Sequence, residues 1–149
     1  MRNLLVLAIL LLFNSCQNSD PKTVEDPIQK GSIEMIIDIK SITRSLEETT
    51  ELLGVATIEM HSGYPCEPKG CKRATFKNGE IEILYFEGLP KRITINNTKD
   101  YTRDKKALGY LGLPIREPSF INPGTVIRWN NVEGLREVSF FYDYIIIDL

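Results

Sequence analysis

A turn dipeptide followed by an alternating segment constrains the fold more than any other part of this sequence. Asn78-Gly79 is a strong hairpin signal, because tight type I′ turns require positive φ angles at both central residues. The next segment, Glu80–Phe86, alternates between charged and apolar side chains, as a strand with one buried face does. Lys72–Phe76, before the turn, has the composition of its partner strand. The sequence therefore predicts an antiparallel hairpin with two unlike faces.

Other segments predict two helices and further strands. Ser45 and Glu48 form a capping-box pattern, which predicts a helix over 46–53. Asp100 is the expected N-cap of a second helix, which Gly112 ends. Strands are expected at the remaining β-branched and aromatic segments, 33–40, 56–61, 92–95, 125–129, 135–142 and 144–149. We therefore expect an α+β domain in which two short helices pack on one face of a mainly antiparallel sheet.

The expected elements recur in the same order along the chain. Leu53-Gly54 and Leu111-Gly112 each end a predicted helix, and a glycine turn, an aromatic strand and a terminal strand follow each of them. We therefore expect one domain over 32–149 that consists of two similar halves, 32–95 and 96–149. Chance recurrence within an α+β protein is the alternative.

An export signal is expected at the start of the chain, MRNLLVLAILLLFNSC. Arg2 precedes the apolar run Leu4–Phe13, which is too short to cross a bilayer as a helix and has the length of a signal-peptide core. Ser15-Cys16 then places a small residue before a cysteine. This pattern resembles a bacterial lipoprotein signal, in which that cysteine is lipidated. An uncleaved anchor and an ordinary secretory signal are the alternatives.

The lipoprotein resemblance implies a division of the chain and a location. Residues 1–15 are the expected signal peptide, and 16–31 comprise the lipidated Cys16 and a polar, proline-containing tether. The lipid on Cys16 would bind the chain to a bilayer. Gln17 stands where sorting patterns place aspartate in proteins kept at the inner membrane, so the resemblance implies the outer membrane. Whether the domain faces the periplasm or the cell surface stays open.

The remaining cysteines predict a disulfide. If Cys16 carries lipid, Cys66 and Cys71 are an even pair, which an exported protein can oxidise. Together with His61 they also form the pattern H-x4-C-x4-C, a set of soft ligands that zinc accepts. Export favours the disulfide, because oxidation removes both thiolates as ligands. We therefore expect no metal and no cofactor.

Charge and motifs narrow the class of function. The formal net charge of −2 gives no reason to expect nucleic-acid binding, which requires a basic patch. The sequence contains no Ser-His-Asp, Cys-His or Gly-x-Ser-x-Gly constellation and no glycine-rich phosphate loop. Glu80 and Glu82 share a strand face, as paired carboxylates could, but beside Ile81 and Ile83 they are typical of a solvated strand side. We do not expect an enzyme, and an enzyme or metal carrier using His61 is the least favoured class.

The alternation also predicts an apolar patch on the solvent side of the sheet. If charged residues such as Glu82 and Asp148 mark that side, several apolar side chains lie beside them. Such a patch usually marks a site for a protein partner. The expected partner-binding residues are Leu84, Phe86, Phe141, Tyr144 and Ile146. Cover by loops or by the other half is the alternative, and Trp129 is expected in the core.

A family resemblance gives the most specific functional expectation. Leu111-Gly112-Leu113-Pro114 and the strand Ile127–Trp129 resemble small bacterial lipoproteins of the outer-membrane-assembly SmpA/OmlA type. They also resemble the tandem-repeat β-lactamase-inhibitor fold and several immunity-type proteins. The resemblance implies a helix-on-sheet fold used for binding without catalysis. We therefore expect a membrane-anchored lipoprotein that acts as a non-catalytic protein-binding module in the bacterial envelope. An immunity or inhibitor lipoprotein that blocks a toxin or hydrolase is the alternative.

Overall fold

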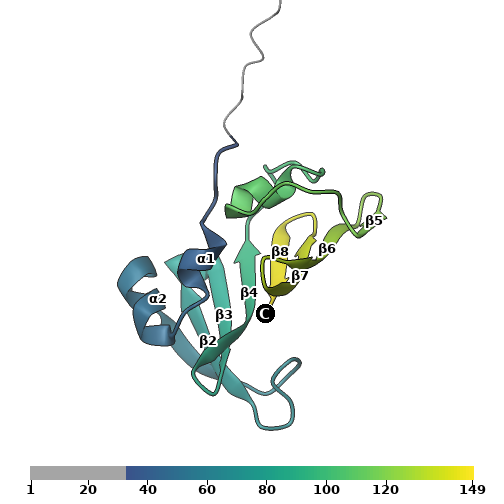
Figure 1. Cartoon of the computed structure of the whole chain (residues 1–149). Helices are drawn as coiled ribbons and strands as arrows, with labels where there is room; N and C mark the ends of the chain where they lie inside the picture. Colours follow the sequence, from purple (N-terminus) through teal and green to yellow (C-terminus); the bar gives the residue numbers. More distant parts are fainter. Residues whose placement is uncertain (1–32) are drawn as a thin grey trace, which may run out of the picture. The chain divides into compact units, whose positions relative to one another are not determined.

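An eight-stranded antiparallel sheet organises residues 33–149, the part of the chain that the computed structural model describes. The expected signal peptide (1–15), the expected lipidation site Cys16 and the expected tether (16–31) lie outside these residues. The strands follow the spatial order β1-β2-β3-β4-β8-β7-β6-β5 (Figure 1). The first four strands thus form one meander and the last four another, and the two meanders join where β4 pairs with β8.

The strand bounds agree with most of the strand expectations. The first meander contains β1 (Thr57–His61), β2 (Cys71–Phe76), β3 (Ile81–Phe86) and β4 (Leu89–Asn96). The second contains β5 (Phe120–Asn122), β6 (Val126–Val132), β7 (Leu135–Phe140) and β8 (Tyr144–Asp148). The mainly antiparallel sheet is confirmed, and β5 is an addition that the sequence patterns did not predict.

The predicted turn joins β2 to β3. The short helical turn η1 (Lys77–Gly79) contains Asn78 at φ 55° and Gly79 at φ 94°. Asparagine and glycine are the residues that reach this left-handed region at the lowest cost. The turn sets the register in which Phe76 faces Ile81 and Ala74 faces Ile83, so apolar side chains share one face.

The strand expected over 33–40 is wrong, because a short helix, α1 (Ile39–Ile42), begins inside it. The Asp38 carboxylate accepts a hydrogen bond from the Lys40 N–H at 3.1 Å and so caps the first turn. Ile39 and Ile42 are then three residues apart, on one helix face, and both are fully buried. Burial of these two isoleucines on the sheet outweighs the local strand preference of the isoleucine-rich segment.

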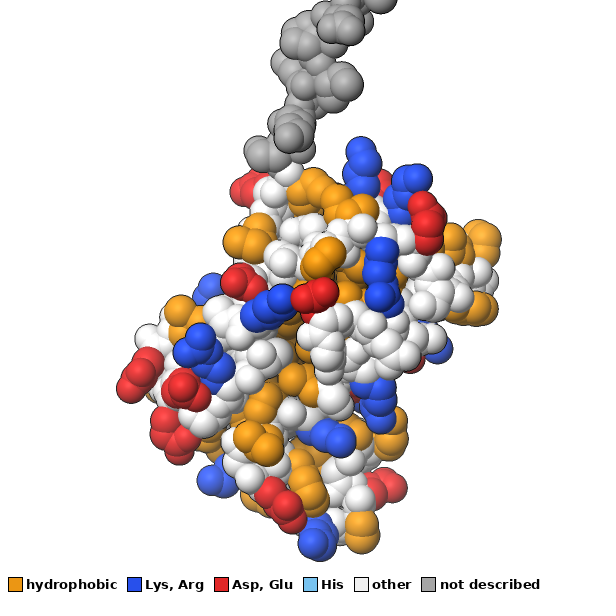
Figure 2. Space-filling view, in the orientation of Figure 1, with side chains coloured by type: hydrophobic (Ala, Val, Ile, Leu, Met, Phe, Trp, Pro, Cys, Tyr) orange, Lys and Arg blue, Asp and Glu red, His pale blue; other side chains and the backbone are white. Residues whose placement is uncertain are grey.

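The second helix, α2 (Leu46–Leu53), confirms the first predicted helix and its capping box. The Glu48 N–H donates to Ser45 Oγ at 3.3 Å, and the Ser45 N–H donates to the Glu48 carboxylate at 3.2 Å. Figure 2 shows that acidic side chains gather over α2. Carboxylates in the first turn, including Glu47, also interact favourably with the helix dipole.

The helix expected to begin at Asp100 is wrong. Only a five-residue 3₁₀ segment, η2 (Ala107–Leu111), forms there. Gly109 disfavours a longer α-helix, and a side chain at this position would come within 2.9 Å of Ile33 Cδ1. Gly112 ends the segment with φ 69°, as expected of a glycine C-cap.

The helices and the sheet enclose one main hydrophobic core, on what we call the inner face of the sheet. The strand register aligns one row of fully buried side chains across it: Ile83, Ile93, Ile147, Val138 and Trp129. Trp129 is therefore in the core, as expected, and its indole N–H donates to the carbonyl of Arg116 at 3.0 Å. Within residues 33–149, no helix has the length and apolar character needed to cross a membrane.

Candidate functional site

The outer face is the side of the sheet opposite the main core, and alternation of side chains determines its members. The register aligns one outer row across five neighbouring strands, namely Arg73, Leu84, Arg92, Asp148 and Glu137. A second outer row contains Glu82, Thr94, Ile146, Ser139 and Arg128. The outer face therefore combines ion pairs with a few apolar side chains.

The loop 62–70 between β1 and β2, which we call the disulfide loop, covers part of the outer face. Cys66 and Cys71 are bonded, with their Cα atoms 5.4 Å apart, and both side chains are buried. They form a small second hydrophobic cluster with Leu84, and Phe86 packs against it. Leu84 is only 8% exposed, so the expectation that Leu84 lies open to solvent is wrong, whereas Phe86 is half-buried. The loop has no hydrophobic periodicity that would predict its packing on the sheet. Alternation within β3 therefore could not show that Leu84 is buried beneath it.

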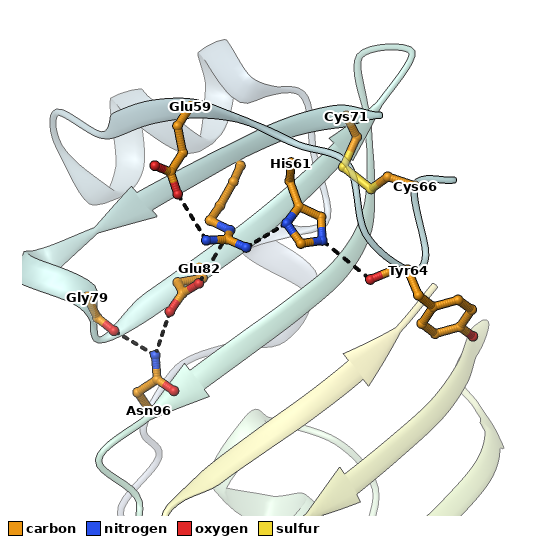
Figure 3. Close-up of polar contacts among 9 residues, drawn as sticks. Glu59, His61, Tyr64, Cys66, Cys71, Gly79, Glu82 and Asn96 are labelled. Atoms are coloured by element: carbon orange, nitrogen blue, oxygen red, sulfur yellow. Dashed lines mark hydrogen bonds and ion pairs between the residues drawn. A yellow bond between two sulfur atoms is a disulfide. The ribbon is translucent and has the colours of Figure 1, made fainter. Parts of the chain in front are cut away.

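The first polar cluster of the outer face, the Arg73 cluster, surrounds one guanidinium group with three side chains. Arg73 lies 2.9 Å from the Glu59 carboxylate and 3.8 Å from the Glu82 carboxylate. It also donates to His61 Nδ1 at 2.6 Å. Glu59, His61 and Glu82 come from β1 and β3 and point toward one another (Figure 3). Asn96 extends the cluster by donating to Glu82 at 3.1 Å.

The contacts of His61 indicate which of its ring nitrogens carries the proton. Because Arg73 can only donate, His61 Nδ1 accepts, and Nε2 then donates to the Tyr64 carbonyl at 3.4 Å. The imidazole is therefore neutral in this arrangement and is engaged at both nitrogens. The two cysteines of the H-x4-C-x4-C pattern are oxidised. Among the described residues, no three His, Cys, Asp or Glu side chains are grouped to hold a metal ion.

The second polar cluster, the Asp148 cluster, places two arginines on one carboxylate. Arg92 Nε donates to Asp148 Oδ1 at 2.6 Å, and Arg92 Nη2 donates to Oδ2 at 3.1 Å. Arg136 Nη2 lies 2.9 Å from the same Oδ2. The bidentate Arg92 contact fixes both groups in one plane. Asp148 lies on the outer face, as expected from the sequence, but it is only 5% exposed.

The ionisation of the Asp148 cluster follows from these contacts. Burial alone would raise the pKa of the Asp148 carboxyl, but the hydrogen bonds and charges of Arg92 and Arg136 outweigh it and lower that pKa. The hydrogen bond to Asp148 raises the pKa of Arg92, and the same carboxylate raises the pKa of Arg136. All three groups are therefore charged at neutral pH.

Tyr64 extends from the disulfide loop to the Asp148 cluster. Its ring points away from His61 (Figure 3) and lies over the Arg92 guanidinium, with 4.9 Å between the guanidinium carbon and the ring centroid. Tyr64 is 64% exposed, so a large aromatic surface stands beside fixed charges. Sequence patterns missed Tyr64 and Arg92 as site residues, because only the folded loop brings them together.

The other three predicted partner-binding residues lie together on the outer face near β8. Phe141 and Tyr144 stack with ring centroids 4.6 Å apart, and Ile146 follows two residues later on the same strand face. All three side chains are half-buried. β4, with Arg92 and Thr94, lies between this group and the other two predicted residues, Leu84 and Phe86. The five predicted residues therefore do not form one patch.

Comparisons with known proteins do not assign a family or a function to this site. No protein-family model, curated protein or solved structure matches the chain.

Proposed function

We propose that this chain is a lipoprotein of the bacterial outer membrane that acts as a non-catalytic protein-binding module through the outer face of its sheet. The observation that carries the proposal is the group formed by Tyr64, Arg92 and Arg136. Tyrosine and arginine are enriched among the residues that dominate the free energy of binding at protein interfaces.

Preorganisation supports the same proposal. The carboxylate of Asp148 fixes Arg92 and Arg136, and Arg92 in turn lies against the Tyr64 ring. A partner that binds fixed side chains pays less conformational entropy than one that must order them. The stacked pair of Phe141 and Tyr144 adds half-buried aromatic surface on the same face.

A comparison of two tyrosines tests the proposed surface. The partner is first identified by photo-crosslinking the lipidated chain in cells, and its affinity for purified variants is then measured by calorimetry. Tyr64→Ala should lower that affinity at least about tenfold, as expected for an interface hot spot. Tyr142→Ala is the matched control. Tyr142 lies in the turn after β7 and is also 64% exposed, and its ring centroid lies 5.5 Å from the guanidinium carbon of Arg103.

Equal losses from Tyr64→Ala and Tyr142→Ala, or no loss from either, would contradict the proposed surface. The identity of the crosslinked partner separates the two functions. An envelope assembly component, as the SmpA/OmlA resemblance implies, supports the binding module. A secreted toxin or hydrolase assigns the immunity or inhibitor function instead.

The proposed location depends on Cys16. Cys16→Ser should abolish metabolic labelling with palmitate and release the domain from the membrane fraction, because one lipid tether holds it there. Gln17→Asp is the matched variant: it should keep the lipid label and move the protein to the inner-membrane fraction. Retention of Cys16→Ser in the outer membrane would overturn the lipoprotein proposal.

We also propose that the halves 32–95 and 96–149 derive from one repeated unit. The symmetrical strand order supports this proposal, since each half contributes a four-stranded meander and its last strand to the junction. Each half also places a short helical segment before its meander.

A further inference from the structure

The two polar clusters of the outer face carry opposite excess charge. The Arg73 cluster contains one guanidinium group and two carboxylates, those of Glu59 and Glu82, beside a neutral His61. The Asp148 cluster contains two guanidinium groups, those of Arg92 and Arg136, and one carboxylate. When only these contacting groups are counted, the Arg73 cluster has one excess negative charge and the Asp148 cluster has one excess positive charge.

In each cluster the most exposed side chain has the sign of the excess charge, whereas Arg92 and Asp148 are more deeply buried. The Glu59 side chain is 56% exposed and the Arg136 side chain is 51% exposed. The Arg92 and Asp148 side chains, at 18% and 8%, are largely enclosed. A partner would thus meet Glu59 on one side of the outer face and Arg136 on the other.

The sheet holds the two clusters at a defined separation. Arg73 on β2 and Arg92 on β4 lie in one row, on either side of Leu84 on β3. Two strand spacings separate these arginines by about 10 Å. The Asp148 carboxylate lies one strand further, on β8. Because Glu59 contacts Arg73 and Arg136 contacts Asp148, complementary charges on a partner need a spacing of about 15 Å. This is close to the distance of about 13 Å between residues four apart in an extended segment.

We propose that the outer face binds a protein segment that carries a carboxylate opposite Arg92 and Arg136 and a basic side chain opposite Glu59 and Glu82. This inference rests on the proposed binding function and adds the chemistry and orientation of the partner. The argument is charge complementarity. Such complementary pairs fix the register of a complex and exclude a partner with the charges reversed, because like charges in contact are strongly unfavourable.

The test pairs charge removal on the protein with charge removal on a probe peptide. The probes are the acetylated, amidated peptides Glu-Thr-Val-Thr-Lys, Gln-Thr-Val-Thr-Lys and Glu-Thr-Val-Thr-Gln, titrated into the isotope-labelled protein by NMR. The first peptide should bind at least about threefold tighter than either neutralised peptide, and its affinity should fall with added salt. The arginine Nε–H signals of Arg92 and Arg136 should shift during the titration.

Protein variants assign each peptide charge to its cluster. Arg136→Gln should abolish the advantage of glutamate over glutamine in the peptide, and Glu59→Gln should abolish the advantage of lysine over glutamine. Arg44→Gln is the control, because Arg44 is exposed, lies beside α2 and pairs with Glu48 at 4.0 Å. It should leave both advantages unchanged.

Two results would overturn the inference: equal binding of the three peptides, or equal effects of Arg136→Gln and Arg44→Gln. Concentration-dependent self-association that Arg136→Gln abolishes would instead assign the charge pattern to a second copy of the chain. If the peptides show no preference but Tyr64→Ala still weakens the natural complex, the inference fails and the proposed function stands. If the peptides behave as expected but no partner is captured, the proposed function fails separately.

Discussion

Asp148→Asn should lower the free energy of unfolding by about 3–5 kcal/mol, because it leaves two largely fixed arginine charges without their carboxylate. Arg92 and Arg136 both contact Asp148 within 3 Å, and the Asp148 side chain is buried. Without the negative charge, the two guanidinium groups repel each other. Urea denaturation monitored by Trp129 fluorescence measures the change.

Glu117→Gln is the control for Asp148→Asn. Glu117 pairs with Lys105 at 3.3 Å, but its side chain is 79% exposed. Solvent screens such a pair, so the expected change is below about 0.5 kcal/mol. Equal effects of the two substitutions would show that the Asp148 cluster does not contribute as a buried ion pair.

Acid should remove the same stabilisation. The folded state lowers the pKa of Asp148 below the ordinary value of 3.8, so the unfolded chain binds a proton more readily. The stabilisation is therefore present above pH 3.8 and is lost as the pH falls through the folded-state pKa. The stability difference between the wild type and Asp148→Asn should be constant near neutral pH and should shrink in that acidic range.

Phe140→Ala should lower the free energy of unfolding by about 3–5 kcal/mol, because it creates a cavity in the core. Phe140 is 1% exposed, and its ring packs edge-on against Trp129 with centroids 5.7 Å apart. Thermal and urea unfolding of the purified domain measure the loss. The shift should appear as a lower midpoint with an unchanged dependence on urea.

The adjacent residue supplies the control for Phe140→Ala. Phe141→Ser removes a half-buried ring that stacks on Tyr144, so we expect a loss of about 1 kcal/mol. This is larger than an ordinary surface substitution, for which about 0.5 kcal/mol is typical. If Phe141→Ser destabilises the domain as much as Phe140→Ala, then the assignment of these neighbours to opposite faces is wrong.

Local signals in the sequence were sufficient for the elements that depend on a few neighbouring residues. The capping box of Ser45 and Glu48, the turn at Asn78-Gly79 and the glycine end at Gly112 all form where expected. Trp129 lies in the core and Phe141 lies on the outer face, both as expected from the alternation along their strands. Each of these features depends on backbone preferences or side-chain periods that act over a few residues.

Longer elements failed where distant packing competes with local preference. The segment 33–40 has strand-forming residues, yet its last residues begin the helix α1. In α1, Ile39 and Ile42 are buried in the core against the sheet. The region before Gly112 has helical spacing, yet only a short 3₁₀ segment forms there, in which Ala107, Leu108 and Leu111 are fully buried. In both places, tertiary packing overrides local propensity.

The sequence by itself determined the Asn78-Gly79 turn, the capping box of α2, the cysteine pair and the alternation of two unlike faces, because these follow from residues close together in the chain. Only the tertiary structure decided which outer residues are covered and which charges meet. The disulfide loop buries Leu84, and Arg92 meets Asp148 across 56 positions of sequence. The physical reason is that exposure and ion pairing depend on which distant segments dock on a face, and alternation within one strand carries no information about its cover.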